Sequence, residues 1–323
     1  MNKKNFKYDN WFFPKMSPSS QRGKTLTSSN FNKEDKDLID IFFREYIQNV
    51  MDARIINTAG ERQSAFLSIK LIDVEAEIVR KYLGNVLPRL IEAGHSKERL
   101  ESAIKSACNK VACLVIEEEG TTGLRGETED SEPDGADEQW NSFWIGEGNE
   151  NKSGKDLGRR GEGKIVKHLV STLSTLFGLT NQQNGKKDLL MGKCFFQKYY
   201  KYNNISFQRY AYFCDQKNIN GEIQQRPIQD VNLIKEFKKE FQIKRTNDNG
   251  TSWVIPAINK DSFKIQNVVR AIISEFYIAI TKGELSIDID GQRIDQGNLM
   301  EVIEQYEVFD PNTSIFVDWI ITS

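Results

Sequence analysis

The sequence predicts an α+β fold built as one large domain or two modest ones. Along the chain, segments with helical periodicity are interspersed with short segments that are typical of strands. At roughly 100–200 residues per domain, the chain's 323 residues are enough to bury a substantial core. Hydrophobic residues make up 38% of the chain and charged residues 28%, which is typical of a globular rather than a disordered chain.

The first half of the chain is predicted to contain three helices and two strands. Residues 1–31 are polar and irregular and are expected to form an arm that packs on the main body. A helix begins at Asn32, whose side chain suits an N-cap, and runs to about Ile56. The next elements are a strand at 64–74, helices at 75–93 and 97–108, and a buried strand at 111–116.

The second half opens with an acidic loop at 127–138, which holds seven acids and no base. This composition is typical of a solvated loop. A Gly-rich polar stretch follows at 146–163. The later elements are a helix at 165–177, strands between 189 and 213, a helix at 233–241, a strand at 253–255, a helix at 263–281, and a hairpin of 284–289 and 293–294 that turns at Asp290–Gly291.

Composition also excludes several classes of protein. The net charge of −2 argues against a uniformly basic nucleic-acid coat. No apolar run approaches the ~20 residues of a membrane span, and no secretory signal follows the basic start, so we expect a cytoplasmic protein. With only His95 and His168, and no CxxC pair, zinc sites and His-dependent catalytic sites are disfavoured. The four cysteines are expected to be free or buried thiols: Cys108, Cys113, Cys194 and Cys214.

The first motif lies in the opening helix. Glu45, Asn49 and Asp52 are spaced i, i+4 and i+7, so they share one face. Apolar residues precede them on that stripe and also fill the opposite face, so the helix is expected to be buried on both sides. Buried carboxylates and amides cost free energy unless they are paired. The pattern therefore favours a functional polar stripe over the competing interpretation, a solvated helix face.

The second motif follows the strand at 111–116. By strand alternation Glu118 points the same way as Leu114 and Ile116, toward the core. Gly120 and Gly123 follow in a turn where a flat ligand could approach the backbone. Taken alone, the motif equally describes an acidic strand end with an ordinary turn.

The third and fourth motifs are rich in glycine. Gly158, Gly161, Gly163 and Lys164 open the predicted helix and suit a phosphate cradle. The spacing also fits a Walker A loop, but Ile165 replaces the required hydroxyl residue and no hydrophobic strand precedes it. A flexible linker is the competing interpretation. The fourth motif, Gly250–Thr251 before a strand, indicates only a turn when taken alone.

In this order the four motifs resemble those of the GHKL ATPase superfamily, which contains gyrase, the ninety-kilodalton heat-shock chaperone, histidine kinases and MutL. The family motif E-x-x-x-N-x-x-D-A is matched at Glu45, Asn49, Asp52 and Ala53, and D-x-G-x-G is approximated at Glu118, Gly120 and Gly123. The Gly-rich lid and the Gly-Thr motif follow. The resemblance covers residues 35 to 256. It implies the Bergerat fold, an α/β sandwich whose mixed, mostly antiparallel sheet carries helices on one face.

The resemblance also implies roles for these residues and two ligands, ATP and Mg²⁺. Glu45 would be the general base that activates water, and Asn49 would bind Mg²⁺. Glu118 would accept a hydrogen bond from the adenine amino group, Gly120 and Gly123 would let the base fit, and Thr251 would support the adenine end. The ATP-binding set is completed by Asp52, Ala53 and the lid residues Gly158, Gly161, Gly163 and Lys164, which would close over the phosphates.

Two departures from the family pattern concern the adenine end. The family's aspartate is replaced by Glu118, which is one methylene longer, and the turn Gly120–Gly123 has one extra residue. The sequence around the motifs looks most like that of uncharacterised bacterial ATPases of this superfamily. Some of these ATPases look linked to DNA restriction or phage defence. We divide the chain into an arm at 1–31, an ATP-binding domain at 32–257 with an acidic loop and lid at 125–164, and a helix-hairpin extension at 258–323.

The leading hypothesis is an ATPase whose nucleotide-driven lid closure or homodimerisation controls a protein partner or a DNA-processing complex. One alternative is an ATP-sensing scaffold without turnover. The other is histidine-kinase-like phosphotransfer, which is disfavoured because neither histidine lies in a recognisable phosphoacceptor helix pair. Direct DNA binding is a further alternative, based on two clusters. They are Lys186, Lys187, Lys193, Lys198 and Lys201 with Tyr199, Tyr200 and Tyr202, and Lys235, Lys238, Lys239, Lys244 and Arg245. The apolar end at 319–323 suggests a fragment of a longer protein or a terminus that packs on a partner.

Overall fold

The structure is a computed structural model of the chain. It describes residues 10–16, 35–104, 108–128, 138–145, 170–183, 185, 187–196, 198–219, 221–245, 249–310, 313 and 317. Several predictions lie outside these residues: most of the arm, the N-cap at Asn32, most of the acidic loop, the Gly-rich lid, His168 and the last residues of the chain.

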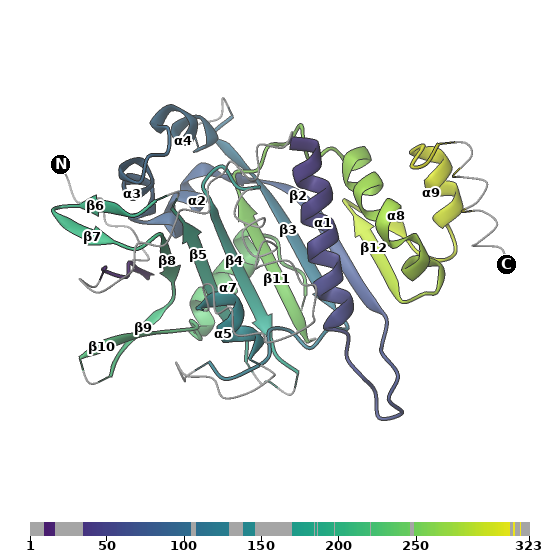
Figure 1. Ribbon diagram of the computed structural model, residues 1–323, viewed down its shortest axis with the longest axis horizontal. Coiled ribbons are helices and arrows are strands. Elements are labelled where there is room, and N and C mark those ends of the chain that lie inside the picture. Colours follow the sequence, from purple (N-terminus) through teal and green to yellow (C-terminus); the bar gives the residue numbers. More distant parts are fainter. Residues whose placement is uncertain are drawn as a thin grey trace, which may run out of the picture.

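A mixed, mostly antiparallel sheet organises the described residues (Figure 1). Its nine strands run in the order β1 (Trp11–Phe12), β8 (Tyr210–Phe213), β5 (Leu189–Phe195), β4 (Thr175–Asn181), β11 (Gly250–Pro256), β3 (Lys110–Glu119), β2 (Ala65–Glu75), β12 (Leu285–Ile289) and β13 (Gln292–Ile294). Within this sheet β12 pairs with β2 in parallel, while the other neighbours are antiparallel. The α+β class and the mixed sheet that the sequence predicts are therefore confirmed.

Two small hairpins stand at the β1 end of the sheet (Figure 1). They are formed by β6 (Tyr200–Tyr202) with β7 (Ile205–Phe207), and by β9 (Asp215–Ile219) with β10 (Glu222–Arg226).

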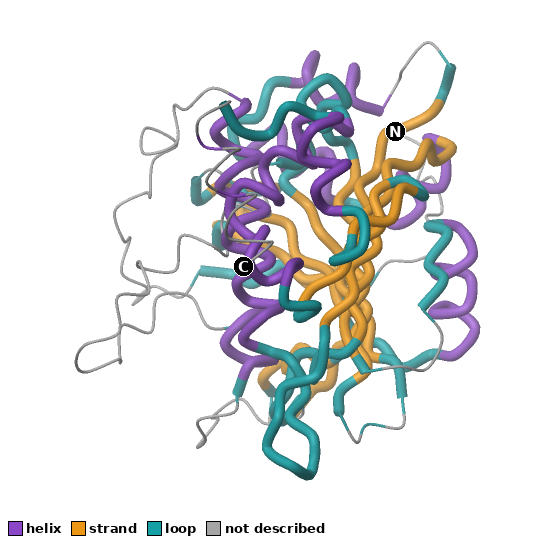
Figure 2. Tube along the Cα trace, turned by 90° about the vertical axis from the view of Figure 1, so that its right-hand side faces the viewer, coloured by secondary structure: helices purple, strands orange, loops and turns teal. Residues whose placement is uncertain are grey.

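Helices cover both faces of the sheet, so the prediction of helices on one face is wrong (Figure 2). The face we call the α1 face carries α1 (Asp35–Asp52), α5 (Gln139–Trp144), α8 (Ile265–Thr281) and α9 (Leu299–Gln305). The opposite α7 face carries α2 (Ala76–Leu83), α3 (Val86–Glu92), α4 (Lys97–Ile104) and α7 (Val231–Glu240). The helices between β2 and β3 account for the difference, because their buried apolar residues supply a second core on the α7 face.

Most predicted elements form, with different ends in some cases. The predicted strands at 64–74, 111–116 and 253–255 correspond to β2, β3 and β11, and those between 189 and 213 to β5–β8. The helices at 233–241 and 263–281 correspond to α7 and α8. The predicted hairpin turn is confirmed, since Asp290 and Gly291 both have positive φ, of 49° and 90°. The opening helix ends at Asp52, earlier than predicted.

Two helix predictions are wrong. The single helix at 75–93 is divided into α2 and α3 because Gly84, at φ 49°, ends the first of them. The helix at 165–177 is wrong at its C-terminal end, where Thr175–Phe177 begin β4. Every residue of β4 is buried, and an apolar run buried on both faces shows no strand alternation.

The predicted extension at 258–323 contributes to the same sheet and core as the preceding residues. β12 pairs with β2 from Leu285 opposite Ala65 to Ile289 opposite Ile69, and α8 lies along α1. Phe263 packs against Phe42 and Phe43 of α1. The domain boundaries at 31 and 257 stay a prediction.

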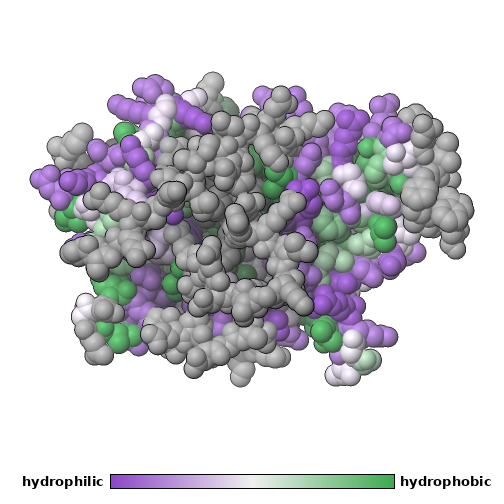
Figure 3. Space-filling model, in the orientation of Figure 1, coloured by the Kyte–Doolittle hydropathy of each residue, from purple (hydrophilic) through white to green (hydrophobic). Residues whose placement is uncertain are grey.

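The described surface in the view of Figure 3 is mainly hydrophilic, with separate hydrophobic spots between hydrophilic residues. The larger exposed hydrophobic side chains include Ile56, Val231 and Ile278, which belong to different parts of the fold. Within the described residues, no helix combines the length and hydropathy needed to cross a membrane.

Candidate functional site

The first motif lies on α1 at the edge of its packed surface. The apolar flank is buried as predicted, with Ile47 and Val50 at most 2% exposed. Glu45 is half-buried, whereas Asn49 and Asp52 are exposed. The Asn49 side-chain amide donates a hydrogen bond of 2.7 Å to the Glu45 backbone carbonyl in its own helix. The polar stripe is thus an accessible edge of the helix, with hard oxygen atoms of the kind that Mg²⁺ prefers.

Hydrogen bonds join the end of the first motif to the second motif. The Thr122 backbone N–H donates to the Ala53 carbonyl at 2.9 Å, and the Ile55 N–H donates to the Gly120 carbonyl at 3.0 Å. Arg54 and Thr121 form an isolated antiparallel bridge between these two contacts. The chain leaving α1 therefore runs beside the turn that follows β3, which brings two separately predicted motifs to one place.

Consecutive glutamates at the end of β3 point to opposite faces of the sheet. Leu114 and Ile116 belong to the core of the α1 face, so Glu118 lies on that side, as the alternation predicts. Glu118 is 7% exposed and its charge, together with burial as the larger cause, raises the pKa of Tyr46 on α1 well above its usual value. Glu117 lies on the α7 face and has a different environment, described below.

The fourth motif lies beside Glu118. Ser252 is opposite Glu117 in the β3–β11 ladder, so the preceding residue, Thr251, lies beside Glu118. Thr251 in turn is opposite Thr180 of β4, and the two hydroxyl oxygens are 2.5 Å apart. Glu118, Thr251 and Thr180 therefore form a polar row across three adjacent strands on the α1 face.

Apolar residues border this polar row. Leu67 is opposite Glu118 on β2, and Leu189 is opposite Thr180 on β5. The next row inward on the same face is apolar or small: Ile69, Ile116, Trp253, Gly178 and Met191. Trp253 and Trp144 of α5 both lie within 3 Å of where a Cβ of Gly178 would be. A polar group at the strand ends with an aromatic and aliphatic floor has the composition of a small-molecule site.

Glycines are required where three backbone segments meet at this end of the sheet. A Cβ on Gly123 would lie 2.5 Å from the Asn181 carbonyl oxygen, and a Cβ on Gly250 would lie 2.0 Å from the Glu118 carbonyl oxygen. Both glycines also have positive φ, of 63° and 142°. Their first role is therefore the close approach of protein backbones, and a role of Gly120 and Gly123 in fitting a base stays a prediction.

Two buried acceptors at this end of the sheet have no hydrogen-bond partner among the described residues. They are Oγ1 of Thr121, which is fully buried, and Oδ1 of Asn181, which is 7% exposed. Buried polar atoms are normally satisfied by protein, water or a ligand. With the Glu118 carboxylate and the paired hydroxyls, these acceptors and hydroxyl groups suit a base that presents amino and ring-nitrogen groups.

The remaining predicted site residues lie outside the described part of the chain. Gly158, Gly161, Gly163 and Lys164 belong to 146–169, so their place relative to Glu45 and Glu118 stays a prediction. Within the described residues, no group of three or more His, Cys, Asp or Glu side chains is placed to hold a metal ion.

Burial removes residues from the predicted nucleic-acid clusters. Lys193 is 6% exposed and donates to the Trp144 carbonyl at 2.9 Å, and Tyr200 is 4% exposed and stacks on Phe207. Arg245 is 3% exposed. These three side chains are packed in the protein interior, while Lys187, Lys198 and Lys201 remain exposed.

The four cysteines, all within the described residues, form no disulfide with one another, and three of them are buried. Burial raises the pKa of Cys113 and of Cys194 to about 12, and raises that of Cys214 further. Thiols held protonated in this way are poor nucleophiles.

A separate hollow of about 700 Å³ lies outside this site, between α1, α8 and the segment after α9. Its lining includes Asp40, Arg270 and Glu307, and none of the described motif residues. Arg270 is already engaged, since it donates to the carbonyls of Tyr306 and Glu307 at 3.1 Å each.

Thr180, Asn181 and Thr121 were not recognised as site residues from the sequence. Thr121 lies inside the second motif and could have been found there. Thr180 and Asn181 fall at the end of β4, just beyond a segment predicted as a helix, and only the register of β4 against β11 brings them to Thr251 and Gly250.

Comparisons with known proteins found similar solved structures, among them two of the ATPase region of one enzyme. The ATPase region of Saccharomyces cerevisiae topoisomerase II bound to ICRF-187 (dexrazoxane) is 12% identical with a TM-score of 0.33, over 82% of this chain and 51% of that chain. The ATPase region of the same topoisomerase II is 11% identical with a TM-score of 0.34, over 83% and 52%. A scan of protein-family models and a search of curated proteins gave no match. The chain spans about half the length of the two structures, and at these TM-scores no functional statement about it follows from them.

Proposed function

We propose that this chain binds ATP with Mg²⁺ and hydrolyses it at the strand-end site beside α1. The observation that supports the proposal best is the meeting of three separately predicted motifs. The α1 motif reaches the second motif through the Ala53–Thr122 hydrogen bond, and the second reaches the fourth through the pairing of β3 with β11. The four ordered motifs resemble those of GHKL ATPases, and the three that lie in the described residues occupy one end of one sheet.

The polar row supplies chemistry for the nucleobase. Glu118 is a nearly buried carboxylate and therefore an acceptor for an exocyclic amino group. The Thr180 and Thr251 hydroxyls can each donate or accept. Adenine presents an amino donor beside a ring-nitrogen acceptor, which this combination suits.

The α1 stripe supplies chemistry for the phosphate end. In the proposal Glu45 activates the attacking water as a general base, and Asn49 contributes its amide oxygen to Mg²⁺. Bound magnesium would neutralise charge on the phosphates. Asp52 and Ala53 bring the helix end to the base-binding turn, and the 158–164 motif is assigned to the phosphates on its sequence alone.

One observation favours the scaffold alternative, in which ATP binds without turnover. The Asn49 side chain is engaged with the carbonyl of its own helix, and Asn49 and Asp52 are exposed. Nucleotide-dependent dimerisation, control of a protein partner, and a role in bacterial DNA transactions or phage defence rest on the resemblance and belong to the same proposal. Phosphotransfer through His95 is disfavoured, because Nε2 of this ring is buried and so is not accessible to a phosphoryl donor.

The test is ATP binding and turnover in the wild type and in Glu45→Ala. Loss of a general base typically lowers turnover by a factor of about 10²–10⁴. We therefore expect Glu45→Ala to lose turnover at least 100-fold while its Kd for a nonhydrolysable ATP analogue with Mg²⁺ stays within about threefold. Sedimentation of the wild type with and without the analogue measures dimerisation in the same samples.

Glu275→Ala provides the matched control, because Glu275 is an exposed glutamate on the neighbouring α8 and pairs only at 3.8 Å with Arg44. It should retain turnover. A wild type that binds the analogue without any turnover supports the scaffold alternative, and a wild type that does not bind it contradicts the proposal as a whole.

A further inference from the structure

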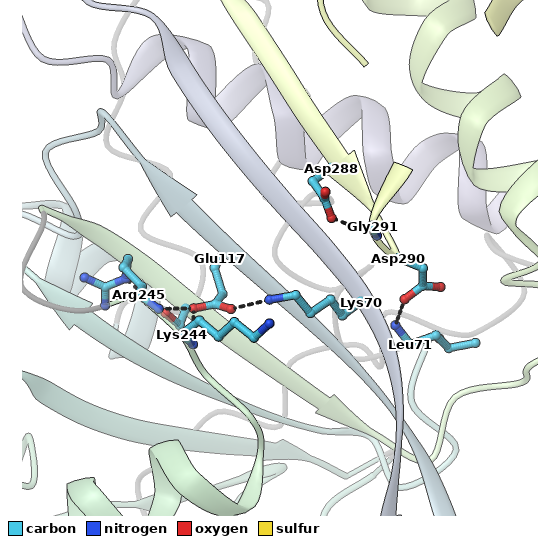
Figure 4. Close-up of polar contacts among 9 residues, drawn as sticks. Lys70, Leu71, Glu117, Lys244, Arg245, Asp288, Asp290 and Gly291 are labelled. Atoms are coloured by element: carbon cyan, nitrogen blue, oxygen red, sulfur yellow. Dashed lines mark hydrogen bonds and ion pairs between the residues drawn. The ribbon is translucent and has the colours of Figure 1, made fainter. Parts of the chain in front are cut away.

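Glu117, on the α7 face, is held by three donors. Its Oε1 accepts from the Lys70 ammonium at 3.0 Å, and its Oε2 accepts from the backbone N–H groups of Lys244 and Arg245 at 2.8 and 2.5 Å (Figure 4). The carboxylate is 3% exposed. It therefore fixes the chain at 244–245 against β3, five residues before the Gly250–Thr251 motif begins.

Arg245 extends the contact across the sheet. Its Nε donates to the Ser252 hydroxyl of β11 at 3.0 Å, and its guanidinium donates to the Leu179 carbonyl of β4 at 2.9 Å. With its backbone bound to Glu117 of β3, this one residue bonds to three adjacent strands. Each of its contacts is next in sequence to a residue of the polar row: Glu117 to Glu118, Ser252 to Thr251, and Leu179 to Thr180.

This arrangement is an expensive one for stability alone. A buried ion pair recovers its desolvation penalty only with good geometry and further hydrogen bonds, and apolar residues of similar volume are often as stable. Arg245 is 3% exposed, and burial lowers its pKa despite the nearby Asp188, Glu118, Glu117 and Glu119 carboxylates. Its positive charge lies near Glu118, which points to the other face of the sheet.

We propose that Arg245, anchored by Glu117, is a positioning residue that fixes Glu118, Thr251 and Thr180 for recognition of an amino-bearing purine. The inference rests on the proposed nucleotide-binding function and adds a determinant of base selectivity. Adenine presents an amino donor where guanine presents a carbonyl oxygen, so an acceptor that is held in a fixed position discriminates between them. Substitution of Arg245 or Glu117 should therefore reduce the discrimination between adenine and guanine even in protein that remains folded.

The experiment measures Kd for nonhydrolysable ATP and GTP analogues with Mg²⁺ in the wild type, Arg245→Met, Arg245→Lys and Glu117→Gln, together with Tm. The ratio of the two Kd values is the readout, because a loss of folded protein affects both nucleotides equally. We expect the preference for ATP over GTP to fall at least tenfold in Arg245→Met and about threefold in Arg245→Lys and Glu117→Gln.

Glu240→Gln is the matched control. Glu240 also lies on the α7 face, where it accepts from Lys81 and from the Tyr82 hydroxyl at 2.6 Å, away from the polar row. It should lower Tm and leave the ratio unchanged. A ratio within twofold of the wild type in folded Arg245→Met overturns the positioning role. If that variant does not fold, an unchanged ratio in both Arg245→Lys and Glu117→Gln overturns it instead. A wild type that binds neither analogue contradicts the proposed nucleotide-binding function. Equal binding of both analogues by the wild type contradicts only the inferred role of Arg245 in base selectivity.

Discussion

At the residue scale, strand alternation explains why two neighbouring glutamates have different environments. Glu117 is saturated by internal donors on the α7 face, and Glu118 faces α1 beside two threonine hydroxyls. The direction of Glu118 is predictable from the sequence because Leu114 and Ile116 precede it at period two. The burial of Arg245 is not, because its local sequence is basic and polar, and only tertiary hydrogen bonds from its guanidinium to Ser252 and Leu179 make a buried arginine tolerable.

The closest backbone approach in the site gives a prediction of stability. Gly250→Ala should lower the free energy of unfolding by about 3 kcal/mol, because the new Cβ meets the Glu118 carbonyl and φ is positive. Urea denaturation measures the change. Gly221→Ala is the control, since Gly221 also has positive φ, of 91°, but its Cβ would meet nothing within 4 Å. A cost of only about 1 kcal/mol is expected there, and equal costs at the two positions would contradict the close approach.

At the element scale, the sequence predicts elements well where periodicity is unambiguous. α8 shows a long helical pattern and β2 alternates, and both form within two residues of the predicted bounds. β4 is buried on both faces and so carries no alternation, which led to its assignment as the end of a helix. The site depends on that strand through Thr180, so the same lack of pattern hid part of the site.

The β12–β13 hairpin gives a prediction at this scale. Asp290 lies in the turn of this hairpin. Its side chain accepts a hydrogen bond of 2.9 Å from the Leu71 N–H of β2, which holds the turn against the neighbouring strand (Figure 4). Asp290→Ala should lower the free energy of unfolding by about 1–2 kcal/mol, because it removes this acceptor and leaves a β-carbon at positive φ without a compensating bond.

Asp290→Asn is the control for this substitution. Asparagine keeps an acceptor oxygen and tolerates positive φ, so urea denaturation should place it within about 0.5 kcal/mol of the wild type. A loss in Asp290→Asn as large as that in Asp290→Ala would show that the carboxylate charge, rather than the hydrogen bond, holds the hairpin.

At the scale of the whole molecule, two hydrophobic cores share one sheet. The core of the α1 face supports the polar row from one side, and the core of the α7 face contains the helices between β2 and β3. Sequence periodicity reveals which segments are amphipathic but not which face of the sheet each one covers. This is why the sequence predicts helical structure between β2 and β3, but neither the division at Gly84 nor the layer that these helices form.

The pH dependence of unfolding is expected to carry a contribution from His95. Burial, with a smaller effect of Arg99, lowers the pKa of His95 from 6.5 to about 4 in the folded chain. The unfolded state then binds more protons between these values, so stability is fully present above about pH 6.5 and is lost as the pH falls toward 4. The shift corresponds to a loss of order 3 kcal/mol.

His95→Asn isolates this contribution, because it removes the titrating ring and leaves the other groups in place. The difference in unfolding free energy between wild type and variant, measured from pH 7 to 4, should shrink as the pH falls. A difference that stays constant over this range would show that His95 titrates normally in the folded protein.

The parallel pairing of β12 with β2 also determines when the sheet can be completed during synthesis of the chain. Its strands are far apart in sequence, with Ala65 opposite Leu285. At about 5–20 residues per second, a ribosome takes of order 10–45 s to make the intervening chain. For that interval the β2 edge lacks its final neighbour, and a bare strand edge invites pairing with another chain. Nascent copies of this protein should therefore depend on chaperones until β12 emerges, whatever the stability of the finished fold.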